Sequence, residues 1–434
     1  MICKKLSDFS TVILGDRKGP FFTLSFDAVL KKYDRIRQRI AEESTEAAYS
    51  FVSKRLKAAQ ALFNKWLDIY ELYARGYATE LLTFSYPAAI LSLDEFDRVL
   101  EDRRPKVFGA NISSEAYVLV DDLFANLGYD SDLYVLAEGD SFEKKSVYTE
   151  VNTESLKNLT KPVSKKTEIE KTLKHIQNRD ISFFYYDGKE YDNALAWPLL
   201  LHECLHYLYY TQGLHQLQKR FASVSWAQEA LIDIYVTNFF GPAYAVSLAN
   251  YLYRRPHEAA ISYPDFAVRL YISSLYLSKL EEMEKLPEST KHPVKEASDY
   301  IKKVLNQYEG RVSAFKKDAD EIVEETNRPI NEIISKKTQP FVDFVRQTEF
   351  ERKEAYKVLE KKYLRKEVLS ISDVLEYYEN GLPVAADPRI LFNSFISRKY
   401  LMDELSMLFF KESLKKWYVK KAWVRSELDV KSKS

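Results

Sequence analysis

The chain has 434 residues, of which 46% are hydrophobic and 14% aromatic, so it can bury a large core and is not intrinsically disordered. Its 64 basic residues balance its 64 acidic ones, which argues against nucleic acid or a membrane surface as a partner. Two cysteines, Cys3 and Cys204, cannot form a disulfide framework, and the N-terminus lacks the apolar run of a signal peptide. We therefore expect a soluble, cytoplasmic protein with more than one domain.

Residues 1–105 predict an N-terminal helical arm. Apolar residues alternate by four and three along Val52, Leu56, Ala59, Phe63, Trp66, Tyr70 and Tyr73. This period of about 3.5 residues is typical of a coiled-coil seam, along which two helices share one face.

Residues 106–290 predict a central domain in which short strands alternate with helices. Strand signals occur at 133–136 and 146–151. A third run at 181–186 is followed by Asp187-Gly188, a dipeptide that favours the tight turn of a hairpin. Together with the long helical flanks, these runs predict an α+β fold that is predominantly α-helical and contains a small sheet.

The segment that begins at Pro198 carries the chemistry. Pro198 suits the first position of a helix, and Gly213 can end it in a left-handed conformation. On that helix His202 and His206 are four residues apart, so both side chains leave from one face and can share an ion. Glu203 lies about a quarter turn further round. In this H-E-x-x-H pattern two imidazoles hold zinc, and the glutamate accepts a proton from a water molecule that the ion activates.

A second helix is expected to complete the site. Ser225 and Gln228 have the spacing of a capping box, which marks a helix start. Glu229 follows directly and offers the third protein ligand that a catalytic zinc site needs. Asp233 lies one turn further on the same face, where a carboxylate can accept a hydrogen bond from a ligand histidine and fix its tautomer.

His202-Glu-Cys-Leu-His206 followed by Glu229-Ala-Leu-Ile-Asp233 resembles the gluzincin group of zinc metallopeptidases. The resemblance covers about 181–243 and implies a zincin-like domain with one Zn²⁺ per chain. The implied ligands are then His202, His206 and Glu229, and Glu203 is the implied general base. Asp233 would not bind the ion but would support a ligand histidine through a hydrogen bond. The substrate implied is a peptide or protein, lying along an edge strand supplied by the hairpin at 181–191.

Other residues of this region have several interpretations. Zinc peptidases often use a Tyr or His to stabilise the oxyanion, and His257, Tyr244 and Tyr235 are candidates, although with 31 tyrosines in the chain a structural role is the favoured interpretation for each tyrosine. Cys204 points away from the two histidines and is expected in the core. A di-iron centre needs a second Glu-x-x-His unit, and none of the other histidines has a glutamate three residues before it.

The uncharged stretch 234–253 is the closest approach to a membrane span. It contains Asn238, Gly241, Pro242 and Asn250, so we interpret it as two buried helices that are broken at Gly241-Pro242.

Residues 291–434 predict a C-terminal helical domain. A second alternating series ends before Pro329 and consists of Ile301, Leu305, Tyr308, Val312, Phe315, Ala319 and Ile322. The two series can pair with each other or with a partner chain, including a second copy, but simple packing in a helical bundle is the favoured interpretation. A catalytically inactive zinc-binding scaffold, which binds partners through these helices, is the alternative to a hydrolase.

Overall fold

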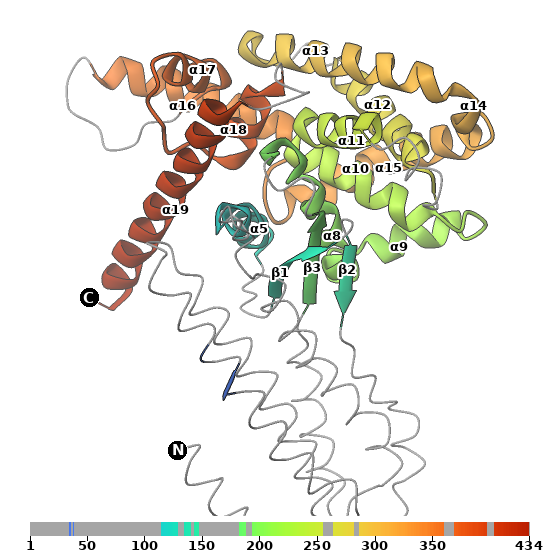
Figure 1. Ribbon diagram of the computed structural model, residues 1–434, viewed down its shortest axis with the longest axis horizontal. Helices are drawn as coiled ribbons and strands as arrows, with labels where there is room; N and C mark the ends of the chain where they lie inside the picture. Colours follow the sequence, from blue (N-terminus) through green and yellow to red (C-terminus); the bar gives the residue numbers. More distant parts are fainter. Residues whose placement is uncertain are drawn as a thin grey trace, which may run out of the picture. The chain divides into compact units, whose positions relative to one another are not determined.

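A computed structural model describes Asp34, Arg35 and Gln38 and residues 114–128, 134–139, 143–146, 182–187, 193–254, 264–281, 286–359, 369–396 and 403–433. The chain divides into two compact units. One comprises Met1–Asn111, Ser131–Glu138 and Lys145–Phe184, and the other Ile112–Asp130, Gly139–Lys144 and Tyr185–Ser434. The helices described below all belong to the second unit, which runs on across residue 290 (Figure 1). The heptad series at 52–73 lies outside the described residues.

The described strands form one small sheet. It consists of β1 (Tyr134–Gly139), β2 (Glu143–Ser146) and β3 (Ser182–Asp187) in the order β1-β3-β2. Because β3 has a neighbour on each side, it is the central strand, so residues 182–187 of the predicted hairpin do not supply a free edge for a substrate. The expected return strand of the hairpin, at 189–191, lies outside the described residues.

The predicted α+β class with a zincin-like domain is also wrong. The described part of the chain is 80% helical, and the core around the histidine motif is built from helices, so the class is all-α with a minor sheet. Among the described residues, strands occur only at 134–139, 143–146 and 182–187. Among the side chains whose burial is described, those in helices supply nearly all of the buried apolar surface.

Two consecutive helices, α10 (Ala227–Phe240) and α11 (Pro242–Arg254), form the centre of the core. Almost every side chain from 230 to 252 is buried, as expected for helices that are apolar on all sides. Gly241 separates them with φ +90, which confirms the predicted break. Among the described residues, no helix is long and apolar enough to cross a membrane.

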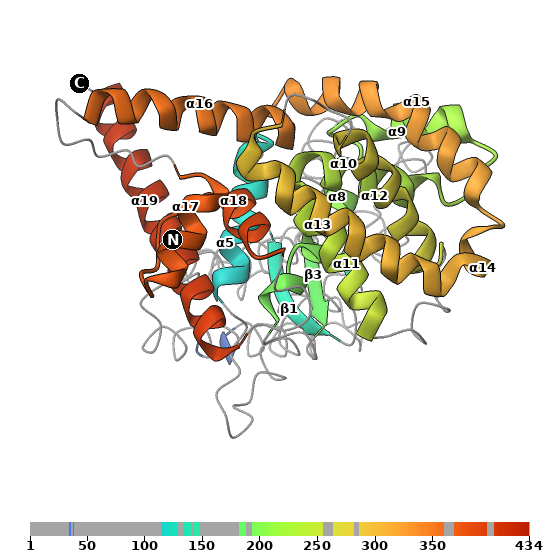
Figure 2. The ribbon, with the colours of Figure 1, turned by 90° about the horizontal axis from the view of Figure 1, so that it is seen from above.

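The helices α12 (Phe266–Glu281), α13 (Glu288–Leu305) and α15 (Lys316–Ser335) pack around this centre, and a short α14 (Glu309–Val312) joins the last two (Figure 2). The helix α13 packs on α11 and α12, whereas α15 packs on α10 and α12. The predicted series at 301–322 is therefore not one continuous seam, because a turn at 313–315 interrupts it. Its buried members, Ile301, Val312, Ala319 and Ile322, belong to the bundle core, and α15 continues through Pro329 to Ser335 instead of ending before it.

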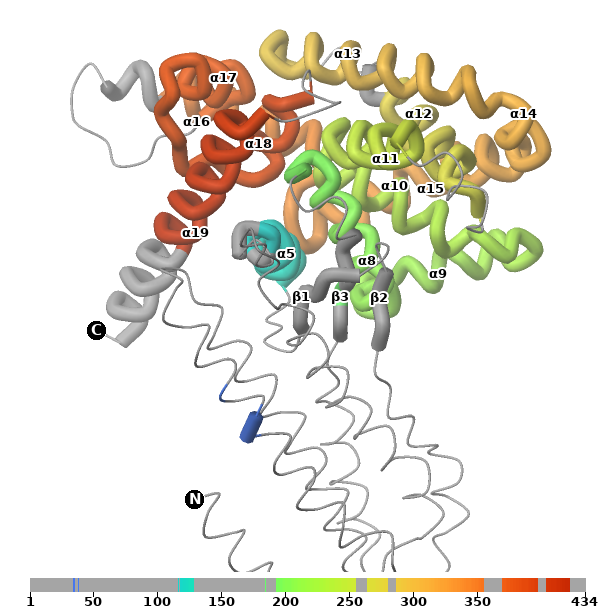
Figure 3. The backbone as a smooth tube through the Cα atoms, in the orientation of Figure 1, coloured from blue at the N-terminus to red at the C-terminus, as the bar shows by residue number. Residues whose placement is uncertain are grey.

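The remaining helices complete the unit. They are α5 (Ser114–Asn126), α8 (Leu199–Leu208), α9 (Leu214–Gln218), α16 (Phe341–Leu359), α17 (Ile371–Glu379), α18 (Pro388–Ser394) and α19 (Glu404–Lys433), and the path through them can be followed in Figure 3. Aromatic edge-to-face contacts between Phe392, Phe395 and Phe410 join α18 to α19. The helix α5 contacts both α8 and α19, so the histidine-bearing helix is enclosed on several sides.

Candidate metal centre

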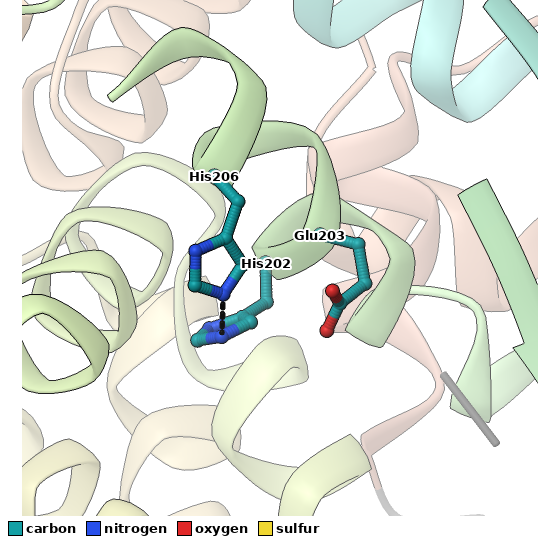
Figure 4. Close-up of side chains that lie close together, drawn as sticks. All are labelled: His202, Glu203 and His206. Carbon is teal, nitrogen blue, oxygen red and sulfur yellow. Dashed lines mark hydrogen bonds between the residues drawn. The ribbon is translucent and has the colours of Figure 1, made fainter. Parts of the chain in front are cut away.

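The helix α8 presents three of the predicted site residues. Its apolar residues Leu199, Leu200, Leu201, Leu205 and Leu208 are buried and hold the helix in the core. His202 and His206 leave the same face one turn apart, with ring centroids 4.8 Å from each other and ring planes at 81° (Figure 4). Cys204 is fully buried, as expected from its place on another face.

Glu229, in the first turn of α10, brings a carboxylate to the two rings. Its Oε2 atom lies 2.9 Å from Nε2 of His202, and its Oε1 atom lies 3.3 Å from Nε2 of His206. The two Nε2 atoms are 3.1 Å apart. A tetrahedral zinc ion with bonds of about 2.0–2.1 Å separates its ligand atoms by about 3.3–3.4 Å. The distances here are 2.9–3.3 Å, and the two from Glu229 run through different oxygens, so small side-chain movements would let the three residues hold one such ion.

Glu203 lies beside this group. Its carboxylate shares a cluster with the two imidazoles in which all ligand-type atoms are within 4.8 Å of one another (Figure 4). That spacing is looser than the spacing of 2.9–3.3 Å around Glu229. Both carboxylates could therefore contribute to a metal site, and Glu229 has the shorter contacts with the two rings.

Behind His202, Asp233 completes a line of charged groups. Its Oδ1 atom lies 2.8 Å from Nδ1 of His202, on the side of the ring opposite Glu229. The side chain of Asp233 is fully buried and pairs with Arg269 of α12 through two contacts of 2.9 Å, and Tyr244 donates a hydrogen bond to it. Buried charges need such partners, because a lone ion in the core is strongly disfavoured.

The electrostatics of these groups are strongly coupled. Burial and the charge of Arg269 lower the pKa of His202, but Asp233 and the hydrogen bond to Glu229 outweigh them and raise it to about 9. Burial raises the pKa of Asp233, and the charges of Arg269 and His202 outweigh it, which brings it to about 2. Burial also raises the pKa of Glu229, but hydrogen bonds from His202 and His206 outweigh this effect and hold the pKa far below its usual range. The site thus alternates anion, cation and anion from Glu229 to Asp233.

The chain was compared with known protein families, proteins and structures. No family model, curated protein or solved structure matches the chain. The resemblance to gluzincins consequently rests on the two short motifs, and the site must be interpreted from its own geometry.

Sequence reasoning missed two residues of this site. Gln228 was interpreted as part of a capping box, but α10 begins with Trp226 at its N-cap and no side chain caps it. Instead Nε2 of Gln228 lies 3.2 Å from Nδ1 of His206. The second residue is Arg269, the only charged residue between Phe266 and Leu277. A single charge in an apolar helix signals a buried ion pair.

The three candidates for oxyanion stabilisation lie in different places. The hydroxyl of Tyr244 is 3.4 Å from Nδ1 of His202, on the Asp233 side of the ring and away from Nε2. The hydroxyl of Tyr235 donates to Gln212 over 3.4 Å. Both tyrosines are fully buried. His257 lies outside the described residues.

Proposed function

We propose that the protein is a zinc-dependent hydrolase that cleaves peptide bonds. The observation that supports this most is the convergence of three donor groups, Nε2 of His202, Nε2 of His206 and the carboxylate of Glu229, at mutual distances of 2.9–3.3 Å. Two imidazoles and one carboxylate are a common ligand set of catalytic zinc, which keeps a fourth position for water or substrate.

The exposure of the donor side chains supports an accessible ion. The side chain of His202 is 2% exposed, whereas those of His206 and Glu229 are 19% and 26% exposed. A ligand set that is buried on one side and partly open on the other suits a reactive centre better than a closed structural site, in which four protein ligands surround the ion.

The residues around the ion have distinct roles in this proposal. Bound zinc supplies Lewis acidity, which polarises a carbonyl and makes a water molecule more acidic. Glu203 accepts the proton of the water that attacks the peptide carbonyl and delivers it to the leaving amine as the C–N bond breaks. Asp233 accepts a hydrogen bond from Nδ1–H of His202, so that the Nε2 lone pair is directed to the ion position.

The test is Glu203→Gln, which keeps the size of the side chain but removes its basicity. We expect the variant to keep its zinc and its fold and to lose peptide cleavage by about a hundred- to ten-thousandfold. The measurement is digestion of a broad peptide library, analysed by mass spectrometry, with zinc determined in the same samples.

The matched control is Glu332→Gln, an exposed position on α15 that pairs with Arg328 and should leave cleavage unchanged. Equal cleavage by wild type and Glu203→Gln would exclude Glu203 as the base. No cleavage by the zinc-loaded wild type would favour the alternative, a zinc-binding scaffold.

A further inference from the structure

Nδ1 of His202 has two close polar neighbours, besides the more distant hydroxyl of Tyr244 at 3.4 Å. Oδ1 of Asp233 and Nη2 of Arg269 each lie 2.8 Å from this nitrogen. The two neighbours are chemically opposite, because a carboxylate only accepts hydrogen bonds and a guanidinium only donates them. One nitrogen cannot serve both at once.

The coordination chemistry decides which neighbour pairs with Nδ1. A histidine that binds an ion through Nε2 carries its proton on Nδ1, so Nδ1 must donate to Asp233. Arg269 then donates two hydrogen bonds to Asp233, from Nε to Oδ2 and from Nη2 to Oδ1, each 2.9 Å long. These two contacts bind both oxygens of the carboxylate and leave it little freedom to rotate.

Three helices meet in this arrangement. Asp233 comes from α10, Tyr244 from α11 and Arg269 from α12, whose guanidinium also lies 5.0 Å from the ring centroid of Phe266. Nη2 of Arg269 is 3.3 Å from the hydroxyl of Tyr244. Arg269 and Asp233 are 7% and 0% exposed, so solvent does not compete for these bonds.

We propose that Arg269 is a positioning residue of the metal centre. By holding both oxygens of Asp233 it fixes the carboxylate that orients the His202 ring, so zinc affinity depends on a residue that does not touch the ion. Without Arg269, neither oxygen of Asp233 is held in place, so the carboxylate can turn away from Nδ1 of His202 and zinc binding weakens. The inference rests on the zinc site of the proposed function, but it does not require that the protein is an enzyme.

The experiment compares Arg269→Gln with wild type in zinc affinity, measured by competition with a chelator, and in the visible absorption of the Co²⁺-substituted protein. We expect zinc binding to weaken by about ten- to a hundredfold, the usual effect of losing a group that supports a ligand. The tetrahedral Co²⁺ bands should broaden or shift, because the ring of His202 is no longer held in one orientation.

The matched control is Arg389→Gln. Arg389 is also buried, and it binds both oxygens of Asp387 over 3.2 Å and stacks on Phe344, outside the site. If Arg269 served stability alone, both variants would lower the melting temperature and neither would alter zinc affinity. We expect the control to bind zinc as tightly as wild type.

The second variant is Arg269→Lys, which keeps the charge and loses the fork of donors. It should fold and bind zinc more weakly than wild type but more tightly than Arg269→Gln. Unchanged or tighter zinc binding in either folded variant overturns the proposal. A wild-type protein that binds no zinc would instead refute the metal centre itself, so the two failures are distinguishable.

Discussion

The imidazole of His202 lies between two carboxylates, Glu229 at Nε2 and Asp233 at Nδ1. In the metal-free protein a proton on this ring neutralises part of their charge, which is why its pKa rises to about 9 although the ring is buried. An ion bound at Nε2 replaces that proton as the cation beside Glu229. Protons and zinc therefore compete for the same atom.

This competition predicts how the stability of the metal-free protein depends on pH. The pKa of His202 is raised from 6.5 to about 9, so the native state holds the proton more tightly than the unfolded state does. The resulting stabilisation is complete below pH 6.5 and is lost as the pH rises towards 9. Its size is about 3 kcal/mol.

The measurement is urea unfolding of chelator-treated protein across this pH range. Saturating zinc should remove most of the dependence, and His292→Gln should leave it intact, because the side chain of His292 is 85% exposed. A flat profile for the metal-free wild type would contradict the charged His202.

At the scale of elements, the junction of α10 and α11 depends on Gly241. Its backbone has φ +90 and ψ −165, a region that side chains avoid. A Cβ atom placed there would lie 2.6 Å from Cδ2 of Phe341, so the ring at the start of α16 packs directly on the backbone. Position 241 therefore requires glycine for two independent reasons, the backbone conformation and the close approach of Phe341.

We expect Gly241→Ala to lower the free energy of unfolding by about 2–4 kcal/mol, the sum of backbone strain and overpacking. The matched control is Gly381→Ala, where φ is +67 but nothing lies within 4 Å of the new Cβ, so only a strain of about 1–2 kcal/mol applies. Denaturant unfolding measures both. Equal losses would show that Phe341 adapts and that packing contributes nothing.

The series from Ile301 to Ile322 shows a limit of periodicity. Apolar residues spaced by four and three occur in one long helix, and also in consecutive helices that follow the surface of one core. The chain turns at 313–315 and the series continues into α15. Pro329 did not end that helix, because the cost of one missing hydrogen bond is offset by the burial of Ile330 and Ile334 on the next turns.

At the scale of the molecule, the proposed ligands come from α8 and α10, so a bound ion would hold two helices of the core together. Anything that binds only the native state stabilises it, by about 4 kcal/mol at a concentration a thousand times the dissociation constant. We therefore expect zinc to raise the melting temperature of the chelator-treated wild type.

The two carboxylates of α10 should differ in this test. Glu229→Ala removes a bond to the ion and should abolish most of the zinc-dependent rise. Asp233→Ala removes only the hydrogen bond that supports His202, so this variant should keep part of the zinc-dependent rise in melting temperature. The metal-free form of this variant is destabilised, because the charge of Arg269 is left unpaired. Calorimetry with and without zinc measures each variant against its own metal-free form. Equal rises for both variants would mean that the third ligand lies elsewhere.

Local features were determined by the sequence itself. The spacing of His202 and His206, the left-handed Gly213 and the break at Gly241-Pro242 depend on residues that are neighbours in the chain, and helix geometry converts such spacing directly into position. The tertiary structure decided the rest. It placed β3 between two strands, turned Gln228 towards His206, and brought Arg269 to a histidine 67 residues away. These contacts depend on which helices pack together, and hydrophobic periodicity marks the face that each helix buries but not the helix that covers it.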